Sequence, residues 1–208
     1  IRKLSEYLSD GNIIVGDFIK KWYFTKPNFV IHGGVDGPKT QSKPKSLSSA
    51  IFIGRLDEHT GVLEYAKTVD LIRKEYPSFD FKIIGDGEYK NRLKRYKPLG
   101  FKKNPEDYLR EYNFAFVSRY LSILDALVNK RLAFALYDNP VKEDYLKMAP
   151  FAKFIIIEKH PDVLAKRVIY YLKNLKKAEK LTKAGYEWVK SQTWDSATSE
   201  YIQLWKNH

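Results

Sequence analysis

The chain has 208 residues, 44% of them hydrophobic and 15% aromatic, which is enough for one large domain or for one domain and part of a second. It contains no cysteine, which excludes disulfides and thiolate metal sites. No apolar run approaches the roughly 20 residues that span a bilayer, and no signal segment is recognisable. These features favour a globular protein of the cytosol. The first residue, Ile1, lies within a helical pattern, which predicts a processed chain or a fragment of a longer one.

The formal net charge of +12 indicates either an anionic partner or a solvated basic surface. Lysines and arginines are spread over predicted helix faces, as in residues 90–95 and 173–183, which favours a solvated surface. Nucleotide phosphates, an acidic membrane surface and nucleic-acid backbones remain as anionic partners. The sequence shows no zinc-finger, aromatic RNA-binding or basic-heptad signature, so we expect no specific binding of nucleic acid.

Strand and helix patterns alternate along the chain. Unbroken apolar blocks predict strands at Ile13–Val15, Phe29–Ile31, Ala50–Ile53, Phe81–Ile84, Phe114–Val117, Leu132–Tyr137 and Phe154–Ile157. Helical periodicity predicts helices at Asp17–Phe24, Val62–Tyr76, Glu88–Arg95, Pro105–Tyr112, Ile123–Lys130 and Asp162–Leu175. After these only helices follow, the last at Asp195–Trp205, with Thr193 or Asp195 as its cap. The alternation is typical of an α/β protein with a doubly wound, Rossmann-like parallel sheet.

One segment interrupts this alternation. Gly37–Ser49, with the sequence GPKTQSKPKSLSS, is polar, carries two prolines and has no periodicity. It predicts a linker between domains. We therefore divide the chain into residues 1–36, a linker at 37–49, a main domain at 50–191 and a carboxyl-terminal helix at 192–208.

The loop after the first strand of the main domain is the first candidate site. Gly54 and Arg55 follow the apolar block at Ala50–Ile53, and helical periodicity resumes after Gly61. The loop at the carboxyl end of a parallel strand meets a helix amino terminus, which favours anions, and Arg55 adds a positive charge. The pattern predicts a phosphate site. The alternative is an ordinary surface turn in which Arg55 pairs with Asp57 or Glu58.

Two further strand ends indicate the same kind of ligand. Gly85, Asp86 and Gly87 stand between a strand and a helix, where backbone can approach a ligand closely or form a plain glycine turn. At the end of another strand, Ser118 and Ser122 offer hydroxyls near a helix start. There Asp125 is able to accept hydrogen bonds from sugar hydroxyls; the alternative is a first-turn acid that complements the helix dipole.

Six segments in order resemble a known enzyme family. They are VIHGGVD, FIGRLDEHTG, IIGDGEYKNRL, LGFKKNPEDYLREYNFAFVSRY, ILDALVNKRLAFALYDNP and YEWVKSQTWDSATSEYIQLW. Together they resemble the landmarks of the family 4, or group 1, glycosyltransferases of the GT-B fold. The resemblance implies that residues 50–191 bind a nucleoside-diphosphate sugar and that residues 1–36 are the last units of an acceptor-side domain. Most of that acceptor domain is then missing from the chain.

The resemblance also assigns roles to single residues. Arg55 matches the arginine that contacts the donor diphosphate, and Gly54 the glycine that permits this approach. The Gly85–Gly87 loop flanks the donor. Phe101 and Lys102 belong to the segment whose main chain holds the base. Asp125 matches the second acid of an E-x7-E motif, which binds ribose hydroxyls, so Arg55 and Asp125 are the expected catalytic residues.

Two positions depart from the family pattern. Thr60, which we include among the donor-binding residues, replaces a lysine that helps to neutralise the leaving diphosphate. Val117 stands eight residues before Asp125, where the first acid of E-x7-E is expected. A neighbouring basic residue, Arg119 or Lys102, is the candidate to compensate. These departures concern the site and leave the fold prediction unchanged.

The two histidines of the candidate loops have open alternatives. His32, beside two glycines, either faces the interdomain cleft or is a polar residue at a strand end. His59 either contacts a phosphate or is solvent-exposed. The sequence shows no metal-ligand spacing, and the family needs no metal, so we expect none and no cofactor besides the donor substrate.

By resemblance, the chain is the donor-binding half of a hexosyltransferase that acts with retention on an unidentified glycan, lipid or protein. We expect it in the cytoplasm, with peripheral association at the cytosolic face of a membrane left open. One alternative is a non-catalytic module that binds nucleotide sugars. A less favoured alternative is a nonspecific nucleic-acid-binding protein.

Overall fold

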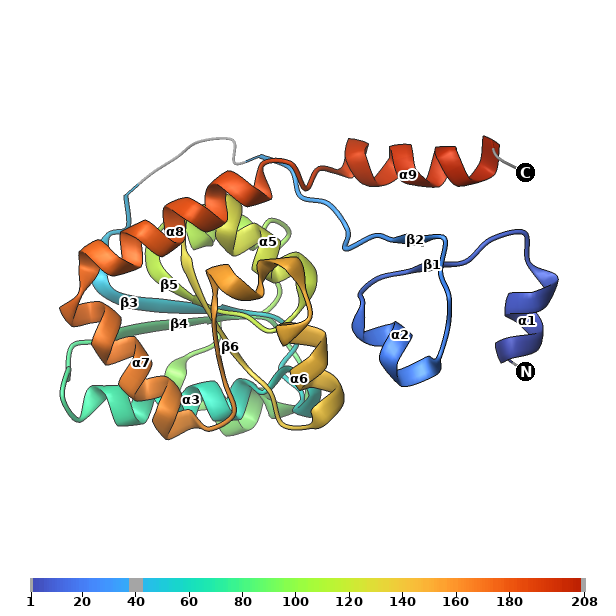
Figure 1. The fold of residues 1–208 in the computed structure, drawn as a ribbon. Coiled ribbons are helices and arrows are strands. Elements are labelled where there is room, and N and C mark those ends of the chain that lie inside the picture. The colour runs from blue at the N-terminus through green and yellow to red at the C-terminus, as the bar shows by residue number, and fades with distance from the viewer. Residues whose placement is uncertain (1, 38–42, 207–208) are drawn as a thin grey trace.

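The computed structural model describes residues 2–37 and 43–206. It consists of a main α/β domain, formed by residues 43–191, and a smaller amino-terminal lobe, formed by residues 2–37 (Figure 1). The last helix, α9 (Trp194–Lys206), leaves the main domain and lies along the amino-terminal lobe. The described part of the chain contains no helix long and apolar enough to cross a membrane.

The main domain is built on one five-stranded parallel sheet with the order β4–β3–β5–β6–β7. The strands are β3 (Ser46–Ile53), β4 (Asp80–Ile84), β5 (Tyr112–Phe116), β6 (Leu132–Leu136) and β7 (Ile156–Glu158). All five residues of β6 are buried, as expected for a strand that is covered on both faces. The apolar blocks of the sequence therefore form the centre of the sheet, as predicted.

Helices cover both faces of this sheet (Figure 1). On one face, α3 (Val62–Arg73) and α7 (Pro161–Lys173) pack together over the first hydrophobic cluster. On the other, α5 (Tyr120–Val128), α8 (Leu175–Val189) and the 3-10 turn η3 (Pro150–Phe154) enclose a second cluster. Shorter elements complete the domain: η1 (Glu58–Thr60), η2 (Glu88–Tyr96), α4 (Glu106–Leu109) and α6 (Pro140–Lys147). The doubly wound prediction is confirmed.

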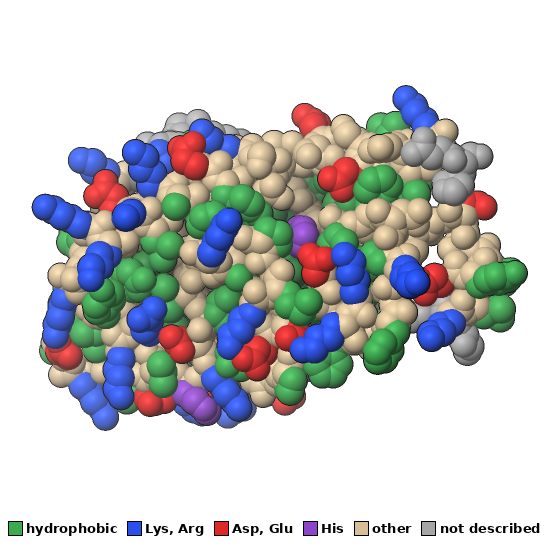
Figure 2. All heavy atoms as spheres, in the orientation of Figure 1, with side chains coloured by type: hydrophobic (Ala, Val, Ile, Leu, Met, Phe, Trp, Pro, Cys, Tyr) green, Lys and Arg blue, Asp and Glu red, His purple; other side chains and the backbone are tan. Residues whose placement is uncertain are grey.

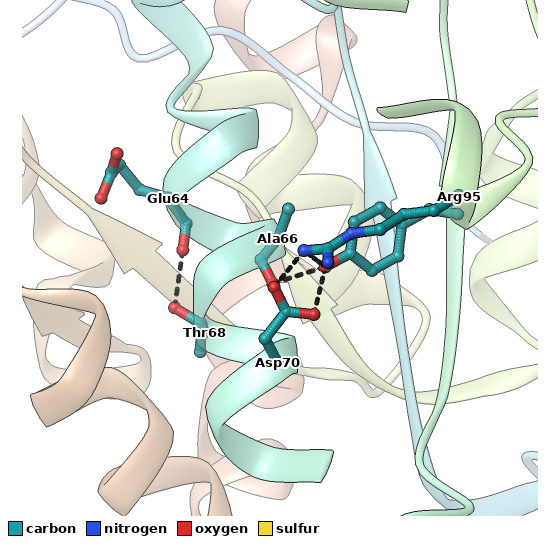
Figure 3. A network of polar contacts seen from close by, with 6 residues as sticks. Glu64, Ala66, Thr68, Asp70 and Arg95 are labelled. Atoms are coloured by element: carbon teal, nitrogen blue, oxygen red, sulfur yellow. Dashed lines mark hydrogen bonds and ion pairs between the residues drawn. The ribbon is translucent and has the colours of Figure 1, made fainter. Parts of the chain in front are cut away.

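Polar contacts attach α3 to its surroundings. The buried Tyr65 stacks on Phe116 at 5.2 Å between ring centroids, and its hydroxyl accepts a hydrogen bond from the Leu136 N–H at 2.9 Å. Figure 3 shows the outer side of the helix, where Arg95 of η2 pairs with Asp70. There the Tyr96 hydroxyl lies 2.6 Å from an Asp70 carboxylate oxygen. These contacts hold the helix that begins just after the Arg55 loop.

The amino-terminal lobe contains β1 (Ile13–Ile14) and β2 (Phe29–Val30), which pair in parallel, with α1 (Arg2–Leu8) and α2 (Phe18–Tyr23). Helix α9 contributes the buried Leu204, which contacts Gly11. Thr193 caps α9, as predicted, because its hydroxyl oxygen accepts a hydrogen bond from the Ser196 N–H at 3.1 Å.

Several elements differ from the prediction. Residues 46–49 of the predicted linker belong to β3, because the Ser49 hydroxyl is buried and accepts the Asn113 N–H at 3.1 Å across the sheet. Residues 38–42 of that linker lie outside the described residues. Helix α6 was not predicted; Asn139 caps it by accepting the Lys142 N–H at 2.9 Å. The helix predicted to reach Tyr112 ends at Leu109, because Tyr112 begins β5.

Charged side chains are scattered over the surface. Figure 2 shows lysines and arginines interspersed with acidic groups over the visible face of the main domain, with no single basic patch. Several pair locally along one helix, including Lys67 with Glu64 and Lys190 with Glu187, at 2.6 Å in each case. The visible face therefore has the dispersed charge that the sequence predicts.

Candidate functional site

The topology selects one edge of the sheet as a candidate site. After β3 the chain turns to β4 on one side, whereas after β5 it turns to β6 on the other. Ligands of doubly wound proteins bind at the carboxyl ends of the strands where the direction of winding reverses. Here that point lies between β3 and β5, because these strands are neighbours. Arg55 follows the first of them and Ser118 follows the second.

A cavity of about 280 Å³ opens at this point. We call it the Arg55 cavity, and its lining residues are Phe52, Ile53, Gly54, Arg55, Thr60, Ser118, Arg119 and Ser122. Five of the predicted site residues thus line one cavity, together with Arg119, which was expected only as a compensating charge. The structure therefore places the loops after β3 and β5 around a common space.

Arg55 is an exposed cation of this cavity. Its side chain is 67% exposed, and its Nε lies 3.1 Å from a carboxylate oxygen of Asp57. This ion pair is the surface contact that the sequence left open as the alternative to a phosphate site. Exposed pairs of this kind are weak, so a phosphate of higher charge can displace Asp57 from the guanidinium.

Thr60 shapes the loop that carries Arg55. It is buried, and its hydroxyl lies 2.8 Å from the Arg55 carbonyl oxygen and 2.9 Å from that of Asp57. Its N–H donates to the Asp57 carboxylate at 3.2 Å. The hydroxyl is therefore engaged within the loop. Its carbonyl oxygen accepts a hydrogen bond from the Ser118 hydroxyl at 3.2 Å, which joins this loop to the one after β5.

The start of α5 forms the other side of the cavity. The Tyr120 N–H, at the first position of the helix, donates to the Tyr145 hydroxyl at 2.7 Å. Arg119 precedes it in extended backbone and makes no side-chain cap. Its exposed guanidinium forms no ion pair with any residue that the structure describes. The strand end therefore presents a charged side chain without a partner in the described chain.

A second cavity, of about 320 Å³, adjoins the first and shares Ser118 and Arg119 with it. We call it the Lys142 cavity, and its other lining residues are Phe18, His59, Asp138, Asn139, Val141, Lys142 and Tyr145. The Lys142 ammonium donates to the His59 carbonyl oxygen at 3.3 Å. Sequence reasoning missed this lysine. The signal was present in the sequence DNPVK, because an Asn cap followed by Pro marks a helix start.

The glycine loop after β4 supports the Arg55 loop from outside the cavity. Gly85 has φ +142°, and a Cβ there would lie 1.8 Å from the Gly54 carbonyl oxygen. The Leu56 N–H donates to the Asp86 carbonyl oxygen at 2.9 Å, and a Cβ on Gly87 would lie 2.7 Å from the Leu56 carbonyl oxygen. This close approach of two backbones accounts for both glycines.

Asp86 has a partner of its own in that loop. Its carboxylate accepts a hydrogen bond from the Lys90 ammonium at 2.7 Å, and this contact lowers the pKa of Asp86. Gly85, Asp86 and Gly87 do not line the Arg55 cavity. In the structure this loop packs against the backbone on both sides of Arg55.

The predicted base-binding segment lies apart from both cavities. Phe101 is 82% exposed. Lys102 lines a separate hollow of about 430 Å³ with Lys103, Asn104, Asp107, Tyr108 and Glu111. The lysine therefore does not replace the missing cation at position 60. Of the two residues expected to compensate, only Arg119 lines the Arg55 cavity.

Asp125 lies on α5 three residues after Ser122, but it faces another hollow, of about 350 Å³. That hollow is also lined by Asp36, Glu106 and Trp194. Burial, together with the nearby charges of Glu106 and Asp36, raises the pKa of Asp125 to about 6. Because α5 begins at Tyr120, Asp125 is not in its first turn. The explanation of Asp125 as a first-turn acid is therefore wrong.

The two histidines lie in different environments. His32 stacks on Tyr120 at 5.5 Å between ring centroids, and its Nε2 lies 3.7 Å from an Asp17 carboxylate oxygen. Burial lowers the pKa of His32 in spite of that carboxylate. His59 is exposed at the edge of the Lys142 cavity. In the described residues, no three His, Asp or Glu side chains converge on a metal site.

No protein-family model matches the chain, and no curated protein matches it. Solved structures, in contrast, match the chain. HepE from Anabaena, in complex with UDP and glucose, matches with a TM-score of 0.78 and 10% identity over 99% of this chain and 65% of HepE. A TarM mutant from S. aureus, in complex with fondaparinux, α-GlcNAc-glycerol and UDP, matches with a TM-score of 0.75 and 16% identity over 96% of this chain and 44% of TarM. The chain thus spans about half to two thirds of these proteins.

A third match shows which part of such a protein the main domain is similar to. It is the carboxyl-terminal domain of LpcC, a group 1 family glycosyl transferase from Francisella tularensis, with a TM-score of 0.56 and 15% identity. The alignment covers 98% of that domain but only 76% of this chain. The remainder of the chain is additional to such a domain. The main domain therefore has the Rossmann-like fold of the carboxyl-terminal domain of GT-B glycosyltransferases, as in this group 1 member.

Proposed function

We propose that this chain is the donor-binding half of a glycosyltransferase that takes a sugar from a nucleoside-diphosphate sugar. The observation that carries this proposal is the Arg55 cavity at the reversal of winding between β3 and β5. Its lining combines an arginine on a tight loop with a helix start and the Ser122 hydroxyl. These groups match the oxygens and negative charge of a phosphate.

The chemistry requires stabilisation of the leaving diphosphate. As the bond to the sugar breaks, negative charge builds on the phosphate oxygen nearest to the sugar. Arg55 stabilises the negative charge of the diphosphate when Asp57 yields the guanidinium. The start of α5 adds the positive end of its helix dipole. The Ser118–Thr60 hydrogen bond ties the loops that carry these two groups together before reaction.

The nucleoside extends along α5 toward Asp125 in this proposal. Asp125 accepts hydrogen bonds from the ribose hydroxyls, and the main chain near Phe101 and Lys102 holds the base. The likeness of fold to glycosyltransferases supports this assignment. We propose a hexosyl group and transfer with retention, as in the family that the sequence resembles. Deprotonation of an unidentified acceptor belongs to the amino-terminal side of the complete enzyme.

A second candidate is a module that binds nucleotide sugars without catalysis. Two observations favour it: the Thr60 hydroxyl is engaged within its loop, and Val117, where the family has an acid, is buried. Both candidates use the same cavity and predict the same binding. They differ in turnover, which is measured as donor consumption in the presence of candidate acceptors.

Calorimetric titration with UDP, GDP and ADP tests the binding that both candidates share. Replacing Arg55→Ala should weaken the diphosphate that binds by roughly 1.5–3 kcal/mol, the range for a hydrogen bond to a charged group. The control is Arg167→Ala, which removes an exposed arginine of α7 that pairs with Glu158. Unchanged affinity in the Arg55 variant, with circular dichroism showing an intact fold, would refute the donor site.

A further inference from the structure

Lys142 approaches the loop in which position 60 lacks the expected cation. Its ammonium donates to the His59 carbonyl oxygen at 3.3 Å, and a Cβ on Gly61 would lie 3.8 Å from it. The charge therefore reaches the residues on both sides of Thr60, although it comes from α6. Thr60 itself is buried with its hydroxyl engaged. Among the described residues, Lys142 of the neighbouring helix α6 is the only amine that contacts this turn.

The ammonium is incompletely neutralised where it stands. An ammonium has three N–H donors, and the described contacts of Lys142 use one of them, on a neutral carbonyl. Asp138 lines the same cavity, but its carboxylate accepts the Asn139 side-chain amide at 2.8 Å and forms no ion pair with Lys142 in the described chain. A partly buried ammonium with no direct counterion favours the binding of an anion.

Arg119 adds a second charge to the same wall. It lines both the Arg55 cavity and the Lys142 cavity, and it lacks an ion-pair partner among the described residues. Burial lowers the pKa of Lys142; Asp138 raises it, and the positive charge of Arg119 lowers it. Two like charges on one cavity repel each other, and an anion between them would remove that repulsion.

We propose that Arg119 and Lys142 form a second anion subsite beside the Arg55 cavity, which binds the negatively charged group that follows the first phosphate of the ligand. This inference rests on the proposed donor site. The shared chemistry is an oxyanion, and it has two sources. One is the second phosphate of the nucleoside diphosphate, in which case Lys142 supplies the charge that Thr60 does not. The other is a carboxylate on the transferred sugar.

The test compares Lys142→Gln with Lys147→Gln, which removes an exposed lysine from the same helix. Calorimetry measures the affinity for UMP, UDP, UDP-glucose and UDP-glucuronate, with the guanosine and adenosine series in parallel. Lys142→Arg keeps the positive charge and should retain most of the affinity. Arg119→Gln probes the subsite from α5 and remains informative if Lys142→Gln does not fold, as judged by circular dichroism.

The subsite is supported in either of two ways. If it binds the second phosphate, Lys142→Gln and Arg119→Gln should weaken UDP about tenfold and leave UMP within twofold. If it binds a sugar carboxylate, UDP and UDP-glucose should be unchanged while UDP-glucuronate weakens by a similar factor. Lys147→Gln should change none of them.

The opposite results separate this inference from the donor site. If Arg55→Ala weakens UDP while both subsite variants bind all four ligands like the parent, the subsite is wrong and the donor site stands. Equal weakening of UMP and UDP would also overturn the subsite, because it would place Lys142 at the first phosphate. If the parent chain binds no nucleotide of any series, the donor site and the subsite are both wrong.

Discussion

The hydroxyl of Ser118 donates a hydrogen bond to the carbonyl oxygen of Thr60 at 3.2 Å, across the reversal of winding between β3 and β5. The two residues lie 58 positions apart in the chain. The Arg55 loop and the start of α5 are therefore connected directly, as well as through the sheet. This connection holds the two loops that carry the charged groups assigned to the donor diphosphate next to each other.

Weakening the Arg55–Asp57 ion pair should strengthen nucleotide binding. Asp57→Asn removes the carboxylate that competes for the guanidinium but keeps an oxygen to accept the Thr60 N–H. Because exposed ion pairs are worth about 0.2–1 kcal/mol, we expect the nucleoside diphosphate to bind up to about fivefold more tightly. Calorimetry at low and moderate salt measures this change.

Asp57→Ala is the matched comparison, because it also removes the oxygen that accepts the Thr60 N–H. It should lower the free energy of unfolding by about 1 kcal/mol, as loss of a capping side chain does. Weaker binding by Asp57→Asn, with unchanged stability, would show that the carboxylate itself helps to hold the ligand.

The charge of Asp125 should destabilise the native chain at neutral pH. Burial and nearby acids raise its pKa to about 6, whereas an aspartate of the unfolded chain titrates at about 3.9. The unfolded chain therefore loses this proton first, and stability falls as the pH rises from about 4 to about 6. Asp125→Asn should unfold with a free energy about 2 kcal/mol higher than the parent at pH 7, and the gain should vanish below pH 4.

Urea unfolding at several pH values measures this difference. The control is Asp162→Asn on α7, which removes a first-turn acid and should cost a few tenths of a kcal/mol at neutral pH. A loss of stability in Asp125→Asn at pH 7 would contradict the assignment of a buried, destabilising charge.

Asp125 should also distinguish ribose from deoxyribose. If it accepts the ribose hydroxyls, Asp125→Asn should weaken a ribonucleoside diphosphate by roughly 1 kcal/mol more than its 2′-deoxy analogue, because a charged acceptor binds more strongly than a neutral one. Calorimetry with the two nucleotides on parent and variant measures this difference. A variant that keeps the full preference for the ribose form would exclude Asp125 from the site.

Replacement of Gly85 should damage the fold near the site. A Cβ at this position would lie 1.8 Å from the Gly54 carbonyl oxygen, and its φ of +142° is one that other residues rarely adopt. Gly85→Ala should therefore lower the free energy of unfolding by about 3 kcal/mol or prevent folding. Gly37→Ala is the control, because no atom lies within 4 Å of its Cβ position. Equal thermal stability of the two variants would contradict the observed packing.

The basic surface should bind nucleic acid only weakly. Charge of this dispersed kind attracts the phosphate backbone without sequence preference, and that attraction falls steeply as salt rises. Fluorescence anisotropy with a labelled duplex should show little binding at physiological salt. Submicromolar affinity for DNA under those conditions would instead favour the nucleic-acid-binding alternative.

The sequence predicts the sheet better than it predicts the site. Apolar blocks such as Leu132–Leu136 form central strands because burial on both faces leaves little choice of residue type. The strand at Ser46–Ser49 was taken for a linker because most of its residues are serines. The Ser49 hydroxyl finds its partner, the Asn113 N–H, across the sheet, which no local pattern reveals. Helix α6 was missed although its Asn cap and Pro were visible, because its residues carry only one fully buried side chain, Leu146.

The predicted site residues differ in how far along the chain their contacts reach. The positions of Arg55 and Ser118 at strand ends predict that they lie close together, because parallel strands bring their carboxyl ends to one edge of a sheet. The engagement of the Thr60 hydroxyl follows from contacts within five residues, but no sequence rule distinguishes it from a free hydroxyl. The approach of Lys142 to His59 joins residues 83 positions apart, so it depends on how two helices pack. Such contacts require the folded structure.

Two segments of the chain connect the main domain to the amino-terminal lobe, and they contact each other at Gly34 and Trp194. The Val35 N–H donates to the Gln192 carbonyl oxygen at 2.9 Å, and a Cβ on Gly34 would lie 2.4 Å from the Trp194 nitrogen. The lobe is held to the main domain at a second place as well. There the ring of Phe18 packs edge-on against Tyr145 at 5.3 Å between centroids, and the Trp22 side-chain N–H donates to an Asp144 carboxylate oxygen at 2.9 Å. With two separate attachments, the lobe keeps Phe18 in place on the wall of the Lys142 cavity, so a residue of the lobe helps to shape the charged subsite.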